Sequence, residues 1–308
     1  MILVTGATGL LGCSFVEQSM SRGYEVTALG FKSEVPLVGA RTLWADLLIP
    51  GEAERLVRQE NPRWLVHCAA ATDVDWCESH PEEALWFNAG VPRALAASIK
   101  NGGGQIVYIS TDAVYRGDRG QYTESDECRP CNVYGRTKLA GERAVSEVLP
   151  DSLVIRTNLF GFTRTSRISL AQWILRELEA GRRVPAFADV VFSPLFTDEL
   201  SNTILDMIGR GLHGIFNIGG KGAVSKYEFA LKLAASFGLN ASLVDPVPAS
   251  ASALKAPRPR NTSLLSARAE ECLDRPMEDL DSGVERFKHA YCKYRRSERA
   301  GIVEQIHA

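Results

Sequence analysis

The chain has 308 residues, of which 45% are hydrophobic and 23% charged, and its 35 basic side chains nearly balance 37 acidic ones. The formal net charge of −2 argues against nucleic acid as a partner, and the ordinary apolar content argues against a mainly disordered chain. Apolar runs are as short as strands and no basic segment precedes Ile2, so we expect a cytoplasmic protein without a membrane span or signal peptide.

The first half of the chain alternates between strand and helix patterns. Apolar, β-branched runs predict strands, and amphipathic stretches between them predict helices. Strands are expected at residues 2–5, 25–29, 41–44, 64–68, 105–110 and 153–156, and helices at residues 11–22, 51–60, 82–100 and 134–149. Such alternation is typical of parallel strands joined by right-handed crossovers. The predicted fold class is therefore α/β, with a Rossmann-type, doubly wound parallel sheet.

The pattern changes after Arg156. Helices are predicted at residues 169–180, 197–210 and 225–237 and a strand at residues 214–217, whereas residues 184–195 look irregular and residues 245–259 look like a loop. Ser225 and Glu228 have the spacing of a helix-capping pair. We expect residues 1–160 and 195–218 to form the sheet domain. Residues 161–194 and 219–308 are expected to form a smaller, discontinuous C-terminal substrate domain.

A glycine-rich turn joins the first predicted strand to the first helix, with glycines at positions 6, 9 and 12. In a βαβ unit such glycines allow a tight turn, close approach of backbone to a diphosphate, and close packing of helix on sheet. The N-terminus of the helix then offers free N–H groups to the diphosphate. The sheet domain is therefore predicted to bind a dinucleotide.

The residues after the second predicted strand indicate which dinucleotide is preferred. Sheets that bind NAD carry an acid about 20 residues past the glycine loop. This chain has Gly30-Phe31-Lys32-Ser33 in that place, and the Lys32 ammonium could pair with a ribose 2′-phosphate. The predicted cofactor is NADP(H), with NAD(H) as the alternative. Lys32 can also be interpreted as a solvated loop residue.

Candidate catalytic groups come from one strand end and one helix. Thr111 follows the strand at residues 105–110, at the edge where open α/β sheets place ligands. Tyr134 and Lys138 are one helical turn apart and share a face. We expect the lysine to lower the pKa of the phenol and to hold a cofactor ribose. The tyrosine would supply a proton while the Thr111 hydroxyl bonds a substrate carbonyl.

Together, the glycine loop, the Ser110-Thr111 pair and the Tyr-x-x-x-Lys motif resemble the extended short-chain dehydrogenase/reductase superfamily. Residues 69–78, 110–115, 130–135, 196–200 and 258–264 look like those of dTDP-4-dehydrorhamnose reductases. The resemblance implies an NAD(P)-dependent oxidoreductase of deoxysugar biosynthesis, which reduces the 4-keto group of a nucleotide-diphosphate 6-deoxysugar. It also implies that Thr111, Tyr134 and Lys138 are catalytic, and that Asp46 contacts the adenine amino group.

The glycine loop, the strand ends and the resemblance together define two sets of site residues. The cofactor-binding set is Gly6, Thr8, Gly9, Leu10, Leu11, Gly12, Phe31, Lys32, Asp46, Leu47, Ala69, Ala70, Ala71, Asn88, Ser110, Tyr134 and Lys138. The substrate set is Thr72, Val74, Thr111, Asp112 and Asn158. Asn88 has a second interpretation, as a brace for the backbone beside the site. No metal site is predicted, because the histidines are scattered and the Cys-x-x-Cys pair at residues 128–131 stands alone.

Two departures refine the expected reaction. Nucleotide-sugar 4,6-dehydratases resemble this pattern but have an Asp-Glu pair after the threonine, whereas here Asp112 is followed by Ala113. Simple reduction is therefore favoured over elimination. Leu159 stands where related reductases usually have an aromatic residue that packs on the sugar, which leaves the identity of the sugar open.

Other functions remain as alternatives. Residues 5–12, 30–32, 66–70 and 134–142 also look like the regulatory beta subunit of methionine adenosyltransferase, which implies an NADP-binding protein that regulates a partner without turnover. A nucleotide-sugar epimerase is the third alternative. A nucleotide sugar is the expected partner, and a homodimer is left open.

Overall fold

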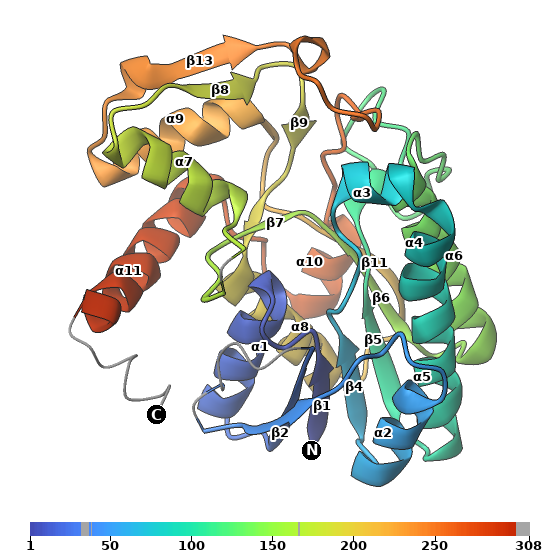
Figure 1. Ribbon diagram of the computed structural model, residues 1–308. Helices are drawn as coiled ribbons and strands as arrows, with labels where there is room; N and C mark the ends of the chain where they lie inside the picture. Colours follow the sequence, from blue (N-terminus) through green and yellow to red (C-terminus); the bar gives the residue numbers. More distant parts are fainter. Residues whose placement is uncertain (32–36, 38, 166, 300–308) are drawn as a thin grey trace.

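A computed structural model describes residues 1–31, 37, 39–165 and 167–299, and its centre is a seven-stranded parallel sheet (Figure 1). The strand order is β11-β6-β5-β4-β1-β2-β3, and every neighbouring pair is parallel. The strands are β1 (Ile2–Thr5), β2 (Val26–Gly30), β3 (Arg41–Trp44), β4 (Trp64–His67), β5 (Gln105–Ile109), β6 (Leu153–Thr157) and β11 (Gly214–Ile218). This confirms the predicted α/β fold class with its Rossmann-type sheet.

Helices cover both faces of this sheet, which explains why its central strands are apolar on both sides. One face packs against α1 (Leu10–Ser21), α8 (Thr197–Gly209) and α10 (Ala267–Leu273). The other face packs against α2 (Glu52–Glu60), α5 (Val91–Asn101) and α6 (Val133–Val148). In Figure 1 these two helix layers lie on opposite sides of the strands. The sheet is therefore doubly wound, as predicted.

One predicted helix is interrupted. Residues 82–100 were expected to form a single helix, but α4 (Pro81–Leu85) and α5 are joined by a π-helical turn, Trp86–Gly90. Single π turns insert an extra residue into a helix and occur often beside functional sites. Here the turn contains Asn88, whose side chain is buried and faces the segment after β4. A short helix that was not predicted, α3 (Val74–Ser79), follows that segment.

A second layer lies beyond the carboxyl ends of the sheet strands (Figure 1). It contains α7 (Leu170–Glu179), α9 (Lys226–Phe237) and α11 (Leu280–Arg299), with Phe160, Phe229 and Phe287 in its own apolar core. The prediction that residues 184–195 are irregular was wrong, because they form β8 (Val184–Phe187), β9 (Val191–Phe192) and β10 (Leu195–Phe196). Each pairs with a partner distant in sequence: β13 (Val244–Val247), β12 (Val224–Ser225) and β7 (Leu159–Phe160).

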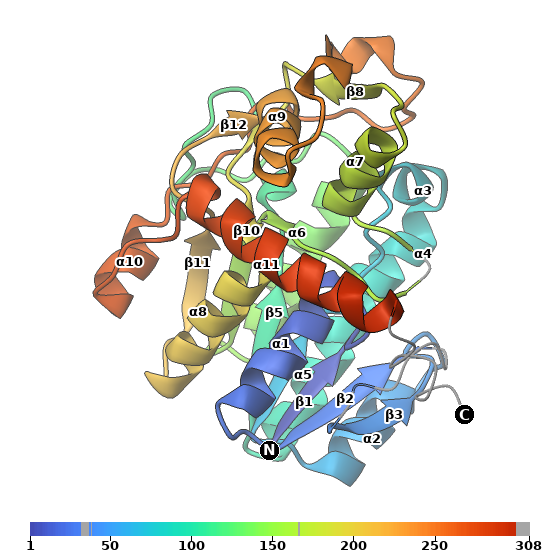
Figure 2. The ribbon, with the colours of Figure 1, turned by 90° about the vertical axis from the view of Figure 1, so that its left-hand side faces the viewer.

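After β10, residues 197–218 return to the central sheet. Helix α8 packs beside α1, and β11 extends the sheet next to β6. Figure 2 shows α11 crossing in front of α1 and α8. Helix α10 also packs in the sheet layer, through Ala269 and Leu273. The exact division into two domains stays a prediction.

Three absences concern the described part of the chain. Within it, no helix combines the length and the apolar character that a membrane span requires. No group of three His, Cys, Asp or Glu residues is arranged there to hold a metal ion. All seven cysteines carry free thiols.

Candidate active site

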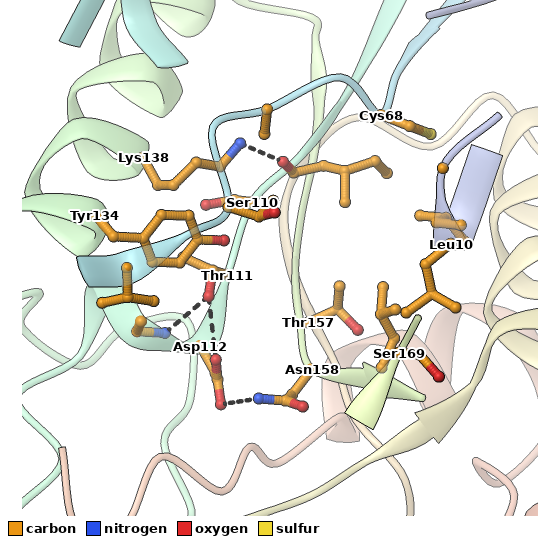
Figure 3. A pocket seen from close by; sticks show the side chains of 18 of the residues that line it. Leu10, Cys68, Ser110, Thr111, Asp112, Tyr134, Lys138, Thr157, Asn158 and Ser169 are labelled. Carbon is orange, nitrogen blue, oxygen red and sulfur yellow. Dashed lines mark hydrogen bonds between the residues drawn. The ribbon is translucent and has the colours of Figure 1, made fainter. Parts of the chain in front are cut away.

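A cavity of about 830 Å³ lies where the carboxyl ends of β1, β4, β5 and β6 meet the second layer. Each of these strands contributes the residues that directly follow it, so the cavity occupies the edge where open parallel sheets bind ligands. Figure 3 shows Lys138, Tyr134 and Ser110 on one side of this cavity and Leu10 and Cys68 on the other.

The glycine loop forms one wall of the cavity. Gly6 has a φ of +62°, and a Cβ there would lie 2.6 Å from the backbone nitrogen of Ala69, so a larger residue fits neither the turn nor the space. Helix α1 begins after Gly9 without a side-chain cap and without an acid in its first turn. Its first N–H groups therefore remain available to an anion at the cavity wall, which fits the diphosphate of a dinucleotide.

Asn88 holds the segment that follows β4. Its Oδ1 accepts from Ala71 N at 2.9 Å, and its Nδ2 donates to Ala71 O at 3.1 Å and to Thr137 Oγ1 at 3.0 Å. These bonds use both amide hydrogens, and the side chain does not line the cavity. The structure therefore favours the interpretation of Asn88 as a brace over that of a direct cofactor ligand.

Helix α6 carries the tyrosine and lysine of the predicted motif. Asn132 caps the helix by accepting from Gly135 N at 2.8 Å, which fixes the first turn where Tyr134 lies. Desolvation in the cavity raises the pKa of Tyr134, and a hydrogen bond with Thr111 acts in the opposite direction. The expectation that Lys138 lowers the pKa of this phenol was wrong, because desolvation dominates and Lys138 is not among the groups that shift it.

The Lys138 ammonium is bound by groups other than the tyrosine. It donates to Ile109 O at 2.7 Å and lies 4.1 Å from the centroid of the Tyr108 ring (Figure 3 shows the first contact). Burial lowers the pKa of Lys138 to about 7, and the nearby Glu142 carboxylate raises it. Lys138 still lines the cavity, one helical turn from Tyr134.

Asp112 organises the opposite end of the site. Its Oδ1 accepts from Thr111 Oγ1 at 3.1 Å, and its Oδ2 accepts from Asn158 Nδ2 at 2.9 Å and from Thr262 Oγ1. Burial raises the pKa of this carboxyl, and the three hydrogen bonds act against that shift. Asp112 thereby connects the strand-end hydroxyl of Thr111 to residues of two later segments, as Figure 3 shows for Thr111 and Asn158.

Most predicted site residues line the cavity. They are Gly6, Thr8, Gly9, Leu10, Leu11, Phe31, Ala69, Ala70, Thr72, Val74, Ser110, Thr111, Asp112, Tyr134, Lys138 and Asn158. Gly12, Asp46, Leu47, Ala71 and Asn88 are not among the lining residues. Gly12 instead packs against the glycine loop, where a Cβ would lie 2.2 Å from Gly6 O. Asp46 accepts from Leu48 N at 2.9 Å, and its predicted adenine contact stays a prediction. Lys32 lies outside the described residues.

Several lining residues were not predicted. One is Thr157, the last residue of β6, and others come from the second layer or its connections: Thr163, Arg167, Ser169, Phe192, Lys226, Arg258 and Thr262. Ser225 and Glu228 do form the expected capping box, which places Lys226 first in α9, but the sequence contains no signal that α9 points into the site. Arg258 and Thr262 lie in a segment that the resemblance had included without assigning a role.

The glycine loop, the open N-terminus of α1 and the Thr111, Tyr134 and Lys138 side chains at the edge of a parallel sheet define an extended short-chain dehydrogenase/reductase. More particularly, residues 1–292 match the family described as RmlD substrate binding domain. The chain belongs to this family.

Individual relatives include a reductase and a subunit of a methionine adenosyltransferase. A dTDP-4-dehydrorhamnose reductase from Mycobacterium tuberculosis is 32% identical over 275 residues, 87% of this chain and 85% of the relative. A methionine adenosyltransferase 2 subunit beta from Danio rerio is 30% identical over 276 residues, 87% of this chain and 84% of the relative. Both resemblances that the sequence suggested are thus confirmed.

A solved structure agrees with the fold over nearly its whole length. The crystal structure of dTDP-4-dehydrorhamnose reductase from Bacillus anthracis in complex with NADP has a TM-score of 0.84 and 27% identity, and the match covers 94% of this chain and 98% of that one. The match includes the second layer as well as the sheet.

Proposed function

We propose that this protein is an NADPH-dependent reductase of a nucleotide-diphosphate 4-keto-6-deoxysugar, similar to dTDP-4-dehydrorhamnose reductases. The single observation that carries the proposal is one continuous cavity, which joins the glycine loop to Thr111, Tyr134 and Lys138. The reductase relative and the NADP complex of a similar structure support the same reaction class and cofactor.

The residues present fit NADP(H) at the glycine-loop wall. Gly9 and the uncapped first turn of α1 would hold the diphosphate, and Lys138 would hold a ribose hydroxyl. When bound, the cofactor supplies a hydride to the carbonyl carbon of the substrate. Phe31 lines the same end of the cavity, where the adenosine half would lie.

Tyr134 is the proposed proton donor. Its raised pKa keeps the phenol protonated at neutral pH, so a proton is available for the carbonyl oxygen during reduction. The Thr111 hydroxyl, oriented by Asp112, would bond the same oxygen.

The acidic groups of the cavity favour reduction over elimination. Among the described residues that line it, Asp112 is the only carboxylate. Its oxygens already accept hydrogen bonds from Thr111, Asn158 and Thr262, so it serves as an organising group and is poorly placed to remove a substrate proton. Leu159 lines the cavity in place of an aromatic residue, so the sugar need not be the one used by close reductase relatives.

A regulatory role is the second candidate function. The similarity to a methionine adenosyltransferase subunit favours it, because the match covers 87% of this chain and 84% of that subunit. We further propose a cytoplasmic location and a division into two domains, one of residues 1–160 and 195–218 and one of residues 161–194 and 219–308. A homodimer is also a proposal, which multi-angle light scattering tests.

The deciding experiment is an NADPH-oxidation screen over dTDP-, UDP- and GDP-linked 4-ketosugars. We expect turnover with at least one of them and a loss of about 100-fold or more in the Tyr134→Phe variant, whose NADPH affinity should stay near that of the wild type. Tyr24→Phe, outside the cavity, is the matched control. Absence of turnover with every ketosugar, together with a stoichiometric protein partner, would establish the regulatory role. Turnover without net NADPH consumption would indicate an epimerase.

A further inference from the structure

Lys226 brings an ammonium group from the second layer into the cavity. It is the first residue of α9, and the capping box between Ser225 and Glu228 fixes the start of that helix. Its backbone nitrogen donates to Val190 O at 3.0 Å, and β12 just before it pairs with β9. In Figure 1, α9 and β9 lie beyond the strand ends of the sheet. The position of Lys226 is therefore set by the backbone on both sides.

The Lys226 ammonium contacts the ring of Phe192 and has no hydrogen-bond acceptor among the described residues. Its Nζ lies 3.1 Å from the centroid of the Phe192 ring, and that ring is itself buried. No oxygen of the described residues accepts a hydrogen bond from Nζ, and none of their carboxylates lies within 4.0 Å of it. A cation–π contact occupies one side of an ammonium and leaves its hydrogens available to another partner.

The other cationic side chains of the cavity are already engaged. Arg258 lies 3.0 Å from Asp75 and Arg167 lies 3.9 Å from Asp73, while Lys138 donates to a backbone carbonyl. Lys226 alone among the described lining cations lacks such a partner. Burial lowers the pKa of Lys226 to about 8 while Asp112 raises it, so the group is still mostly charged at neutral pH. A charged donor that lines a cavity and has no acceptor within the protein is available to acceptors of a ligand.

Asp112 indicates which kind of ligand group could bind Lys226. It is the one acid that shifts the pKa of Lys226, and the charges of these two groups offset each other. An ammonium whose charge is offset by a carboxylate suits a neutral acceptor, such as the oxygen of a sugar hydroxyl. A methyl group would leave the ammonium without a partner, and an anionic sugar substituent would be opposed by Asp112.

We infer that Lys226 is a specificity-determining residue, which donates hydrogen bonds to ring hydroxyls of a neutral sugar bound beside Asp112. This inference rests on the proposed function, which supplies the nucleotide sugar as the class of ligand. It predicts that the ring hydroxyls of the sugar face the second layer. The methyl group of a 6-deoxysugar would then face away from Lys226, toward the apolar lining.

Calorimetric titration separates the sugar contact from all others. The probes are dTDP-, UDP- and GDP-linked 6-deoxyhexoses and the three free nucleoside diphosphates, each added to the NADP+-saturated protein. In Lys226→Met we expect the affinity for the best nucleotide sugar to fall about tenfold to a hundredfold, the effect of losing hydrogen bonds from a charged donor. Affinity for the free nucleoside diphosphate should not change. Lys221→Met, which removes an exposed lysine outside the cavity, should bind like the wild type.

Each other outcome overturns the assignment. An equal loss for the nucleoside diphosphate would place the ammonium on the phosphates, and unchanged affinity would make Lys226 a packing residue. Failure of the wild type to bind any nucleotide sugar would also reject it. Thermal unfolding and NADPH titration of Lys226→Met verify that the variant is folded. Sugar binding without NADPH oxidation would reject the proposed reductase activity alone, since this titration requires no turnover.

Discussion

Glu142 and Arg156 form a buried ion pair directly behind the catalytic candidates. Arg156 Nη2 donates to Glu142 Oε2 at 2.7 Å and its Nε donates to Oε1 at 3.0 Å, with side-chain exposures of 5% and 3%. Ser110 also donates to Glu142, and Arg156 Nη1 donates to Tyr115 Oη at 2.9 Å. The pair therefore joins α6, which carries Tyr134 and Lys138, to the end of β6.

Removing the Glu142 carboxylate should destabilise the fold strongly. Glu142→Ala leaves the Arg156 charge buried without its partner, and we expect the free energy of unfolding to fall by about 3–5 kcal/mol. Glu147→Ala, on the same helix, breaks the exposed ion pair with Arg93 and should cost about 0–1 kcal/mol. Urea denaturation measures both. Equal losses in the two variants would contradict the role given to the buried pair.

A methyl group at Gly12 should distort the glycine loop. Its Cβ would lie 2.2 Å from Gly6 O and 2.8 Å from Ala7 Cα, both backbone atoms, so the loop must move. We expect Gly12→Ala to raise the Kd for NADPH by about tenfold or more. Gly209→Ala, where a Cβ meets nothing within 4 Å, should bind NADPH normally. Fluorescence titration with NADPH compares the two variants. Equal NADPH affinities would argue against a cofactor site at the glycine loop.

The sheet was predictable because its determinants are local. Strands buried on both faces, such as β1 and β6, begin with continuous apolar runs in the sequence. Gly23, in the left-handed conformation, directly follows the predicted helix 11–22. Strands β8, β9 and β10 have two to four residues each, and their partners lie far away in the chain. Such short pairings depend on tertiary contacts, so residues 184–195 carried no local strand signal.

The site likewise contains residues that local sequence patterns predict and residues that only tertiary contacts bring in. Thr111, Tyr134 and Lys138 could be found because a strand end and a helical spacing place them together. Lys226 and Phe192 could not, since only the antiparallel pairing of β9 with β12 brings them into the cavity. The pKa of Tyr134 was misjudged for a related reason. Sequence spacing locates the ammonium one turn away but does not reveal that Ile109 O and the Tyr108 ring bind it.

Asn88 should affect cofactor binding without touching the cofactor. Asn88→Ala removes three hydrogen bonds to Ala71 and Thr137, and leaving their partners unsatisfied should cost about 1–3 kcal/mol of unfolding free energy. The loosened segment after β4 lines the cavity, so KM for NADPH should rise more than kcat falls. Asn101→Ala, at the exposed end of α5, is the control, and a variant indistinguishable from it would exclude the bracing role.

Lys138 should impose a specific pH dependence on stability. Its pKa is about 7 in the folded protein, below the ordinary value of about 10.4 that holds for the unfolded chain. Between these values the unfolded chain binds the extra proton, so the free energy of unfolding rises with pH across that window, by at most about 1.4 kcal/mol per pH unit. Below pH 7 both states are protonated and the slope from this group disappears.

Urea denaturation from about pH 6 to 10 tests this dependence. The free energy of unfolding should rise more steeply with pH for the wild type than for Lys138→Met. The control Lys100→Met removes a surface lysine that donates to Val148 O and should keep the wild-type slope. Parallel curves for wild type and Lys138→Met would mean that Lys138 titrates normally in the folded protein, and the lowered pKa assigned to its buried ammonium would then be wrong.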